Sequence, residues 1–210
     1  MQKILIFGGA GFLGSHLADS FVETDSVICV DNFMTGNLWN IRHLLDRKNF
    51  KLVKGDIRDK PFMMEITKGV DIIFLLAALI HVDRSYIEPE LTFDINVRGT
   101  QNVLEASKRN DVPKIVFAST SEVYGTAETI PMTENHPLLG THPYAASKIS
   151  ADRMCYSYAK TFGMDITITR CFNFFGPRQR DSGYGGVLAI FARRLLNGMP
   201  PLIYGNGSQE

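Results

Sequence analysis

The sequence predicts an α/β fold with a doubly wound parallel sheet. Six short apolar runs lack the polar alternation of half-exposed strands, and segments long enough for a helix separate them. No internal repeat, low-complexity tract or charge block interrupts the pattern. Parallel strands need long crossovers, so we expect right-handed connections with helices on both faces of the sheet. The runs are residues 3–7, 26–31, 50–53, 70–76, 114–119 and 165–169.

A glycine-rich turn follows the first run. Two registers of a dinucleotide-binding fingerprint match it, Gly9-x-Gly11-x-x-Gly14 and Gly8-x-x-Gly11-x-x-Gly14, and both stay open. Glycine lets the backbone turn sharply and approach a ligand, and the first amide groups of a following helix attract a diphosphate. The alternative is a turn with a purely structural role.

An acid, Asp31, ends the second run. At the end of the second strand of a dinucleotide fold, a carboxylate accepts hydrogen bonds from the adenosine ribose, and its charge repels a 2′-phosphate. The glycine turn and Asp31 together therefore predict a bound dinucleotide, with NAD favoured over NADP.

The third and fourth runs lead into further candidate contacts. Asp56 can accept from an adenine amino group or form a solvated pair with Arg58, and Ile57 can pack on the adenine ring. Ala77 and Ala78 follow the fourth run, where small residues either let a ligand approach or pack a helix tightly. The sequence leaves these alternatives open.

The remaining segments complete the predicted architecture. Helical spacing of apolar residues predicts a helix over residues 88–108, before the fifth run. After Gly176-Pro177 the pattern loosens, with one short helix expected over residues 187–196. We therefore expect a domain over residues 1–175 and the beginning of a second, truncated region over residues 176–210.

Composition excludes several classes of function. Lys plus Arg and Asp plus Glu are equal at 22 each, so no global field attracts nucleic acid. The longest apolar run, residues 72–80, falls far short of the ~20 residues that span a bilayer. We see no leader-like start and read Cys29, Cys155 and Cys171 as core thiols in a reducing compartment. These features predict a cytoplasmic protein without nucleic-acid, membrane or metal partners.

Tyr144 and Lys148 are spaced by one helical turn and share a helix face. An ammonium near a phenol lowers its pKa, so this spacing predicts that Tyr144 takes a proton from a substrate hydroxyl. NAD would accept the hydride from the same carbon, and Thr120, at the end of the fifth run, would hydrogen-bond the oxygen. The alternative for Tyr-x-x-x-Lys is an exposed helix face.

Together these motifs resemble the extended short-chain dehydrogenase/reductases, the NAD-dependent epimerase/dehydratase family that remodels nucleotide sugars. The resemblance covers essentially the whole chain and rests on Gly8 to Gly14, Asp31, Asp56-Ile57, Ser119 to Gly125, Tyr144 to Lys148 and Arg170 to Arg178. It implies a Rossmann-type domain over residues 1–175, a substrate-binding region beginning at residue 176, and a homodimer. It also implies that bound NAD oxidises a nucleoside-diphosphate sugar, usually at C4, and later returns the hydride.

The same resemblance assigns residues to roles. The implied catalytic residues are Thr120, Glu122, Tyr144 and Lys148. The implied cofactor-binding residues are Gly8, Gly11, Phe12, Leu13, Gly14, Asp31, Asn32, Thr35, Gly36, Asp56, Ile57, Ala77, Ala78, Asn96, Ser119, Tyr144, Lys148 and Phe172. The implied substrate-binding residues are Arg84, Ser85, Ser121, Asn173 and Arg178. For Asn96, anchoring of backbone is an equal alternative.

The motifs conflict on the step that comes after oxidation. Glu122 stands where related 4,6-dehydratases carry the acid that removes the C5 proton. Ser121 replaces the aspartate that protonates the leaving hydroxyl in the sugar-TDP dehydratases, whereas GDP-mannose dehydratases resemble this chain in having serine. The stretch from Gly176 through Gly183 to Phe191 and residues 204–207 are similar to 4-epimerases. Ile149 departs from the basic residue typical of UDP-glucuronate decarboxylases. Epimerisation and dehydration both stay open, with decarboxylation as the alternative.

Two further expectations concern rival interpretations. A non-catalytic NAD-binding sensor is the rival from another class, and the intact Thr120, Tyr144 and Lys148 argue against it. His142, in the loop before Tyr144, lacks metal-ligand company and is expected to be a surface or packing histidine, and His81 is a candidate to face substrate.

Overall fold

The computed structural model describes residues 1–181, 185–203 and 205–207. The chain divides into two compact units, Met1–Phe172 and Asn173–Glu210, and each is described by itself. Gly183 and Tyr204, which contributed to the resemblance to 4-epimerases, lie outside the described residues.

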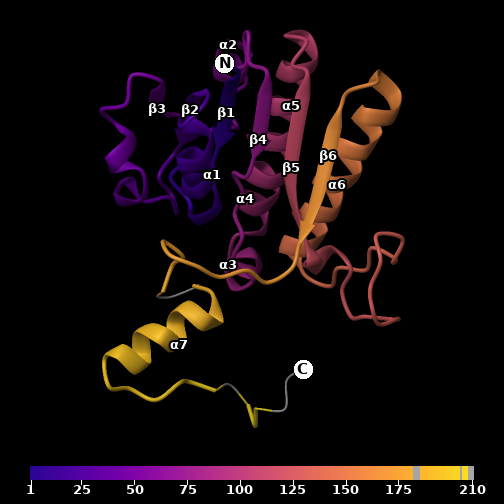
Figure 1. Ribbon diagram of the computed structural model, residues 1–210. Helices are drawn as coiled ribbons and strands as arrows, with labels where there is room; N and C mark the ends of the chain where they lie inside the picture. Colours follow the sequence, from indigo (N-terminus) through magenta and orange to yellow (C-terminus); the bar gives the residue numbers. More distant parts are fainter. Residues whose placement is uncertain (182–184, 204, 208–210) are drawn as a thin grey trace. The chain divides into compact units, whose positions relative to one another are not determined.

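The first unit is built on a parallel sheet with the order β3-β2-β1-β4-β5-β6 (Figure 1). The sheet therefore confirms the predicted doubly wound α/β fold. Its strands are β1 (Lys3–Phe7), β2 (Ser26–Asp31), β3 (Phe50–Lys54), β4 (Ile72–Leu75), β5 (Lys114–Thr120) and β6 (Ile166–Cys171). The order reverses between β1 and β4, and ligands of such sheets bind where the strands end at this reversal.

Helices connect most of the strands. The α-helices of the first unit are α1 (Phe12–Val22), α2 (Lys60–Ile66), α3 (Val82–Ile87), α4 (Pro89–Phe93), α5 (Thr100–Arg109) and α6 (Pro143–Phe162). Short 3-10 turns are η1 (Leu38–Asn40), η2 (Arg42–Leu44) and η4 (Ser121–Val123), and η3 (Asp94–Gly99) is π-helical. In the second unit, α7 (Val187–Leu196) lies where the sequence predicted a short helix.

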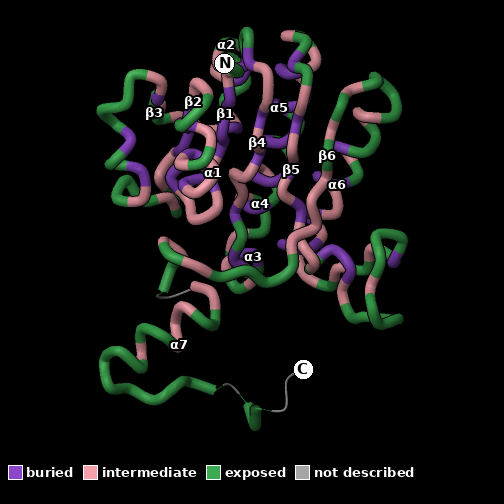
Figure 2. The backbone as a smooth tube through the Cα atoms, in the orientation of Figure 1, coloured by how far each residue is buried: buried purple, intermediate pink, exposed green. Residues whose placement is uncertain are grey.

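Two apolar cores lie on opposite faces of the sheet. Alternate residues of β1 divide between them, because successive strand side chains point to opposite faces. Leu5 and Phe7 join the core formed with α2, α5 and α6, whereas Ile4 and Ile6 join the core formed with α1. The strands β1 and β2 are consequently buried on both faces, while β5 alternates between buried and half-buried residues (Figure 2).

Two expectations about the connections need correction. Residues 32–49, all of them described, form the 3-10 turns η1 and η2, so the expectation of a helix in every connection is wrong here. Buried Ile41 and Leu44 cover the sheet from these turns in place of a helix. The helix expected over residues 88–108 is present as α4, η3 and α5, with a π-helical segment in the middle.

The described residues contain no helix with the length and apolar character needed to span a membrane.

Candidate active site

The glycine turn after β1 is packed too closely for side chains. Gly8 has a φ of +83°, and a Cβ there would lie 3.0 Å from the backbone nitrogen of Ala77. A Cβ at Gly14 would lie 2.2 Å from the carbonyl oxygen of Gly8, and one at Gly9 would lie 2.5 Å from the Cys29 side chain. Gly8 and Gly9, the first glycines of the two registers that the sequence left open, are therefore both closely packed. Only Gly8 also has a positive φ.

The helix α1 begins directly after this turn, with Gly11 as its N-cap. Among the described residues no side chain caps this end, and the first turn carries no acidic residue. The positive end of the helix dipole therefore favours an anion at this turn, with Phe12 and Leu13 half-buried beside it. The turn and helix start fit the diphosphate of a dinucleotide.

Asp31 lies beside this turn. Its Oδ2 accepts from the backbone nitrogen of Ala10 at 2.9 Å, and its Oδ1 accepts from that of Phe33 at 2.8 Å. Burial raises the pKa of the carboxyl group. A Cβ at Gly36 would lie 2.6 Å from Oδ1, so this glycine lets residues 31–36 fold back over the carboxylate, with Thr35 exposed at its edge.

The end of β3 brings Asn32 and Asp56 together. Asn32 Nδ2 donates to Asp56 Oδ2 at 2.9 Å, and Arg58 Nη2 donates to the same oxygen at 2.7 Å. The hydrogen bonds from Arg58 lower the pKa of Asp56 to about 2. The ion pair with Arg58 that the sequence left open is thus present, while an adenine contact of Asp56 stays a prediction. Ile57 is only 4% exposed and packs against Gly99, which leaves little of its side chain for an adenine ring.

Buried Asn96 ties the end of β4 to α6. Its Oδ1 accepts from the backbone nitrogen of Leu79 at 2.8 Å, and its Nδ2 donates to the Leu79 carbonyl at 3.0 Å. The same Nδ2 donates to Ser147 Oγ at 2.9 Å. These bonds show the anchoring role, and they join the segment that contains Ala77 and Ala78 to the residue before Lys148.

Thr120, Glu122 and Tyr144 meet beyond the end of β5. Thr120 Oγ1 accepts from the backbone nitrogen of Glu122 at 3.3 Å and hydrogen-bonds the Tyr144 side chain. Tyr144 is 6% exposed, and its burial raises its pKa to about 12. The hydrogen bond from Thr120 opposes this shift, whereas the charge of Glu122 adds to it.

The buried ammonium group of Lys148 binds the backbone of β5. Its Nζ donates to the Ala118 carbonyl at 2.6 Å and lies 4.3 Å from the centroid of the Phe117 ring. Burial lowers its pKa to about 8. In the chain by itself, desolvation of the buried phenol is the largest cause of the raised pKa of Tyr144. That Lys148 lowers the pKa of this phenol during the reaction stays a prediction.

Behind Lys148, a buried ion network joins α6 to β5 and β6. Asp152 is fully buried and accepts from Ser119 Oγ at 2.8 Å and from Arg170 Nε at 3.0 Å. Arg153 Nη2 donates to the same carboxylate at 2.7 Å. The hydroxyl of Ser119, a predicted cofactor contact, is thereby already donating to an interior carboxylate.

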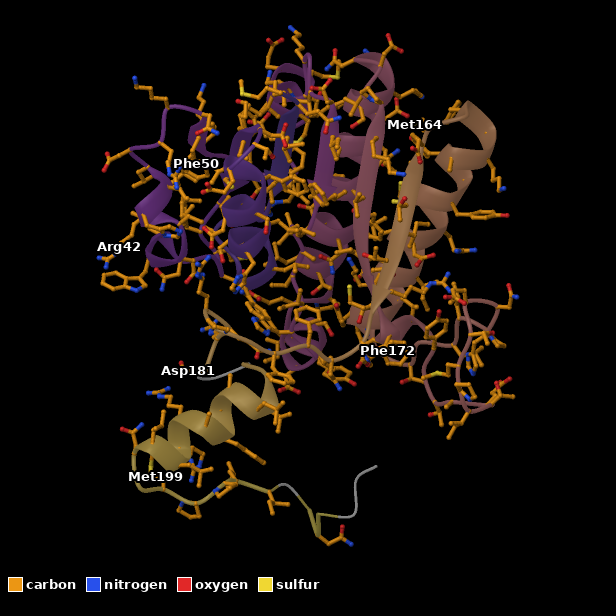
Figure 3. All side chains as sticks on the ribbon, viewed as in Figure 1. Arg42, Phe50, Met164, Phe172, Asp181 and Met199 are labelled. Carbon is orange, nitrogen blue, oxygen red and sulfur yellow. The ribbon has the colours of Figure 1, made fainter. Side chains whose placement is uncertain are left out.

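The predicted substrate residues are more scattered. Arg84 pairs with Glu88 on α3, and buried Ser85 donates to the Val82 carbonyl at 2.6 Å, while Ser121 begins η4. Phe172 is half-exposed at the end of β6, where Figure 3 labels it, with its ring centroid 6.3 Å from that of Tyr124. Asn173 and Arg178 belong to the second unit, and their contacts with substrate stay predictions.

Sequence reasoning missed His142, which is the N-cap of α6. Its Nδ1 accepts from the backbone nitrogen of Ala145 at 3.2 Å, and its Nε2 lies 3.1 Å from Glu122 Oε2. Its ring is stacked on that of Tyr144, with centroids 6.0 Å apart. The signal was its place just before Pro143, which is typical of a helix N-cap. The interpretation of His142 as a mere surface or packing residue therefore misses its contacts with Glu122 and Tyr144.

Comparisons with known proteins agree with this geometry. A family model described as GDP-mannose 4,6 dehydratase matches residues 5–210. A putative UDP-glucose 4-epimerase of Methanocaldococcus jannaschii is 40% identical over 209 residues, which cover 98% of this chain and 67% of that protein.

Solved structures are equally similar. A UDP-N-acetylglucosamine 4-epimerase from Methanobrevibacter ruminantium, in complex with UDP-N-acetylmuramic acid, is 35% identical with a TM-score of 0.94, over 99% of this chain and 67% of that one. A dTDP-glucose 4,6-dehydratase from Streptomyces venezuelae with NAD bound is 37% identical with a TM-score of 0.89, over 99% of this chain and 66% of that one. The chain thus spans about two thirds of the length of these relatives. It belongs to the extended short-chain dehydrogenase/reductase family of nucleotide-sugar epimerases and dehydratases.

Proposed function

We propose that the protein is an NAD-dependent enzyme that oxidises a nucleoside-diphosphate sugar at C4 and then epimerises C4 or eliminates water across C5 and C6. The observation that carries this proposal is the meeting of Thr120, Glu122 and Tyr144 beyond the end of β5. The S. venezuelae dehydratase, which is 37% identical, has NAD bound, and the glycine turn, the start of α1 and Asp31 fit the same cofactor.

Bound NAD would supply the hydride acceptor. Tyr144 would take the proton of the C4 hydroxyl, and Thr120 would hold that oxygen in line by a hydrogen bond. With a pKa of about 12 in the chain by itself, the phenol is protonated at neutral pH. Its activation therefore depends on positive charge that the bound state adds. The hydrogen bond that Lys148 donates to the Ala118 carbonyl supports a role in fixing the end of β5.

Glu122 decides between the two outcomes. Its side chain is half-exposed beside Tyr144, where a carboxylate can remove the C5 proton of a 4-keto sugar. Dehydration uses that step, whereas simple epimerisation at C4 does not. Decarboxylation of a nucleotide-linked glucuronate stays an alternative, and so does a non-catalytic NAD sensor.

The test is substrate-dependent NADH absorbance in the full-length protein, with UDP-glucose, UDP-glucuronate, dTDP-glucose and GDP-mannose as substrates. Product masses distinguish loss of water, loss of carbon dioxide and no mass change. Tyr144→Phe is expected to keep NAD bound and to lower turnover by about 10²–10⁴-fold, the usual contribution of acid–base catalysis. Tyr156→Phe, which changes an exposed phenol on the same helix, is the matched control. Unchanged turnover in Tyr144→Phe would contradict the assigned role.

Three further predictions from the sequence extend this proposal. The protein is proposed to be a cytoplasmic homodimer, and Asn173 and Arg178 are proposed to contact the sugar nucleotide. Sedimentation of the full-length protein tests the dimer, and the Michaelis constant of an Arg178→Ala variant tests the substrate contact.

A further inference from the structure

His142 and Glu122 form a pair that the proposed chemistry does not yet use. His142 Nε2 lies 3.1 Å from Glu122 Oε2. The histidine side chain is 11% exposed and the glutamate side chain is 50% exposed, so the pair reaches from the edge of the buried Tyr144 to open solvent. The ring of Tyr86 on α3 is tilted by 59° to the imidazole, with ring centroids 6.4 Å apart.

The backbone fixes which nitrogen of His142 carries the proton. The amide of Ala145 donates to Nδ1 at 3.2 Å, so Nδ1 is an acceptor. In the neutral ring the proton is then on Nε2, which donates to Glu122 Oε2. A helix cap therefore sets the tautomer, and the tautomer gives the carboxylate a hydrogen-bond donor in a fixed position.

Glu122 is held from its backbone as well. Its amide donates to Thr120 Oγ1 at 3.3 Å, and Thr120 also hydrogen-bonds the Tyr144 side chain. The backbone of Glu122 and the phenol of Tyr144 thus share Thr120 as a partner, and the carboxylate of Glu122 and the phenol both contact the imidazole of His142.

We propose that His142 is a positioning residue that holds the Glu122 carboxylate beside Tyr144 for proton transfer at the sugar ring. This inference rests on the proposed function. His142 acts through Glu122: its Nε2–H donates a hydrogen bond to the carboxylate oxygen that is not accepting the substrate proton. The geometry fits the chemistry of both groups, because Nε2–H is a donor and the carboxylate oxygens accept.

The experiment is a double-mutant cycle in the full-length protein with the variants His142→Ser and Glu122→Gln. Serine caps helices well but is too short to reach Glu122, so His142→Ser keeps the start of α6 and removes the donor. We expect about a tenfold loss of turnover and of solvent deuterium exchange at sugar C5 in the Glu122 protein, the usual effect of a hydrogen bond to a charged group. In the Glu122→Gln background we expect no further loss. The proposal would be overturned if the losses of turnover in the two single variants multiplied in the double variant. It would also be overturned if Glu122→Gln left turnover and exchange unchanged.

Controls separate positioning from folding. His43 Nε2 pairs with Asp19 Oδ1 at 2.7 Å on the exposed surface, so His43→Ser removes a histidine–carboxylate pair away from the site and is expected to keep full turnover. NAD affinity and thermal midpoint of His142→Ser should match the parent protein. If His142→Ser does not fold, His142→Asn provides a second capping residue.

A measurement without substrate distinguishes this proposal from the proposed function. Nitrogen-15 chemical shifts of the His142 ring should show the Nε2–H tautomer, and its hydrogen-bonded proton signal should be lost in Glu122→Ala. An Nδ1–H tautomer would overturn the pair whatever the reaction is. Absence of NADH formation with every sugar nucleotide would instead overturn the proposed function and leave the tautomer result standing.

Discussion

The two halves of the sheet present different chemical groups at the edge where a ligand is expected to bind. At the ends of β1 and β2 the site is mostly backbone: a glycine turn, an uncapped helix start and a carboxylate held by amide groups. At the ends of β4 and β5 the site is made of side chains that depend on buried partners, such as Asn96 with Leu79 and Lys148 with Ala118. The comparison teaches that backbone sites are encoded locally, whereas side-chain sites are encoded by contacts distant in the chain.

The halves also differ in how they are buried. β1 lies between two apolar cores, so its turn is fixed by packing from both faces. In β5 only every second residue is buried. Ser119 in this strand and Lys148 beside it are held by hydrogen bonds to Asp152 and to the Ala118 carbonyl instead. Substitutions are therefore expected to destabilise the β1 half through lost packing and the β5 half through lost polar contacts.

The largest effect is expected at the buried network of the β5–β6 half. Asp152→Ala should lower the free energy of unfolding by about 3–5 kcal/mol, because it leaves Arg170 without its carboxylate partner in the interior. Urea unfolding measures the change. Arg153→Ala removes a partly exposed partner of the same carboxylate and should cost at most about 1 kcal/mol. Equal losses in the two variants would show that the network does not hold this half together.

A smaller effect is expected at the glycine turn of the β1–β2 half. Gly8→Ala should lower the free energy of unfolding by about 3 kcal/mol, because the residue has a φ of +83° and its Cβ would lie 3.0 Å from the backbone of Ala77. Gly69→Ala is the control, since Gly69 has a φ of +61° with open space around it, and should cost only about 1 kcal/mol for backbone strain. NAD affinity should fall in Gly8→Ala alone. A Gly8→Ala protein as stable as Gly69→Ala would contradict close packing in this half.

The smallest effect concerns acid stability at the end of β3. The pKa of Asp56 is lowered from 3.8 to about 2, so its stabilising contribution is fully present above 3.8 and is lost as the pH falls through about 2. At neutral pH we expect the free energy of unfolding of the parent protein to exceed that of Asp56→Asn by about 1–2 kcal/mol, after allowance for solvent screening. This difference should vanish near pH 2. The exposed Asp46→Asn serves as a charge control. A difference that persists unchanged at pH 2 would rule out the Asp56–Arg58 ion pair as its source.

Much of the fold was predictable, because strand and helix signals are local. The six strands were predicted within a few residues, since each is a short apolar run bounded by turn residues. The connection between β2 and β3 was not, because whether a segment packs as a helix or as 3-10 turns depends on the surface it covers, here through Ile41 and Leu44. The glycine turn was predicted in kind, but which glycine needs a positive φ required the position of Ala77.

The sequence by itself determined the sheet, the glycine turn followed by Asp31, and the helix that presents Tyr144 and Lys148 on one face. Only the tertiary structure decided that Lys148 donates to Ala118, that burial raises the pKa of Tyr144, and that His142 faces Glu122. The physical reason is that residue spacing fixes direction along one helix or strand. Desolvation and hydrogen-bond partners are set instead by the segments that fold against it.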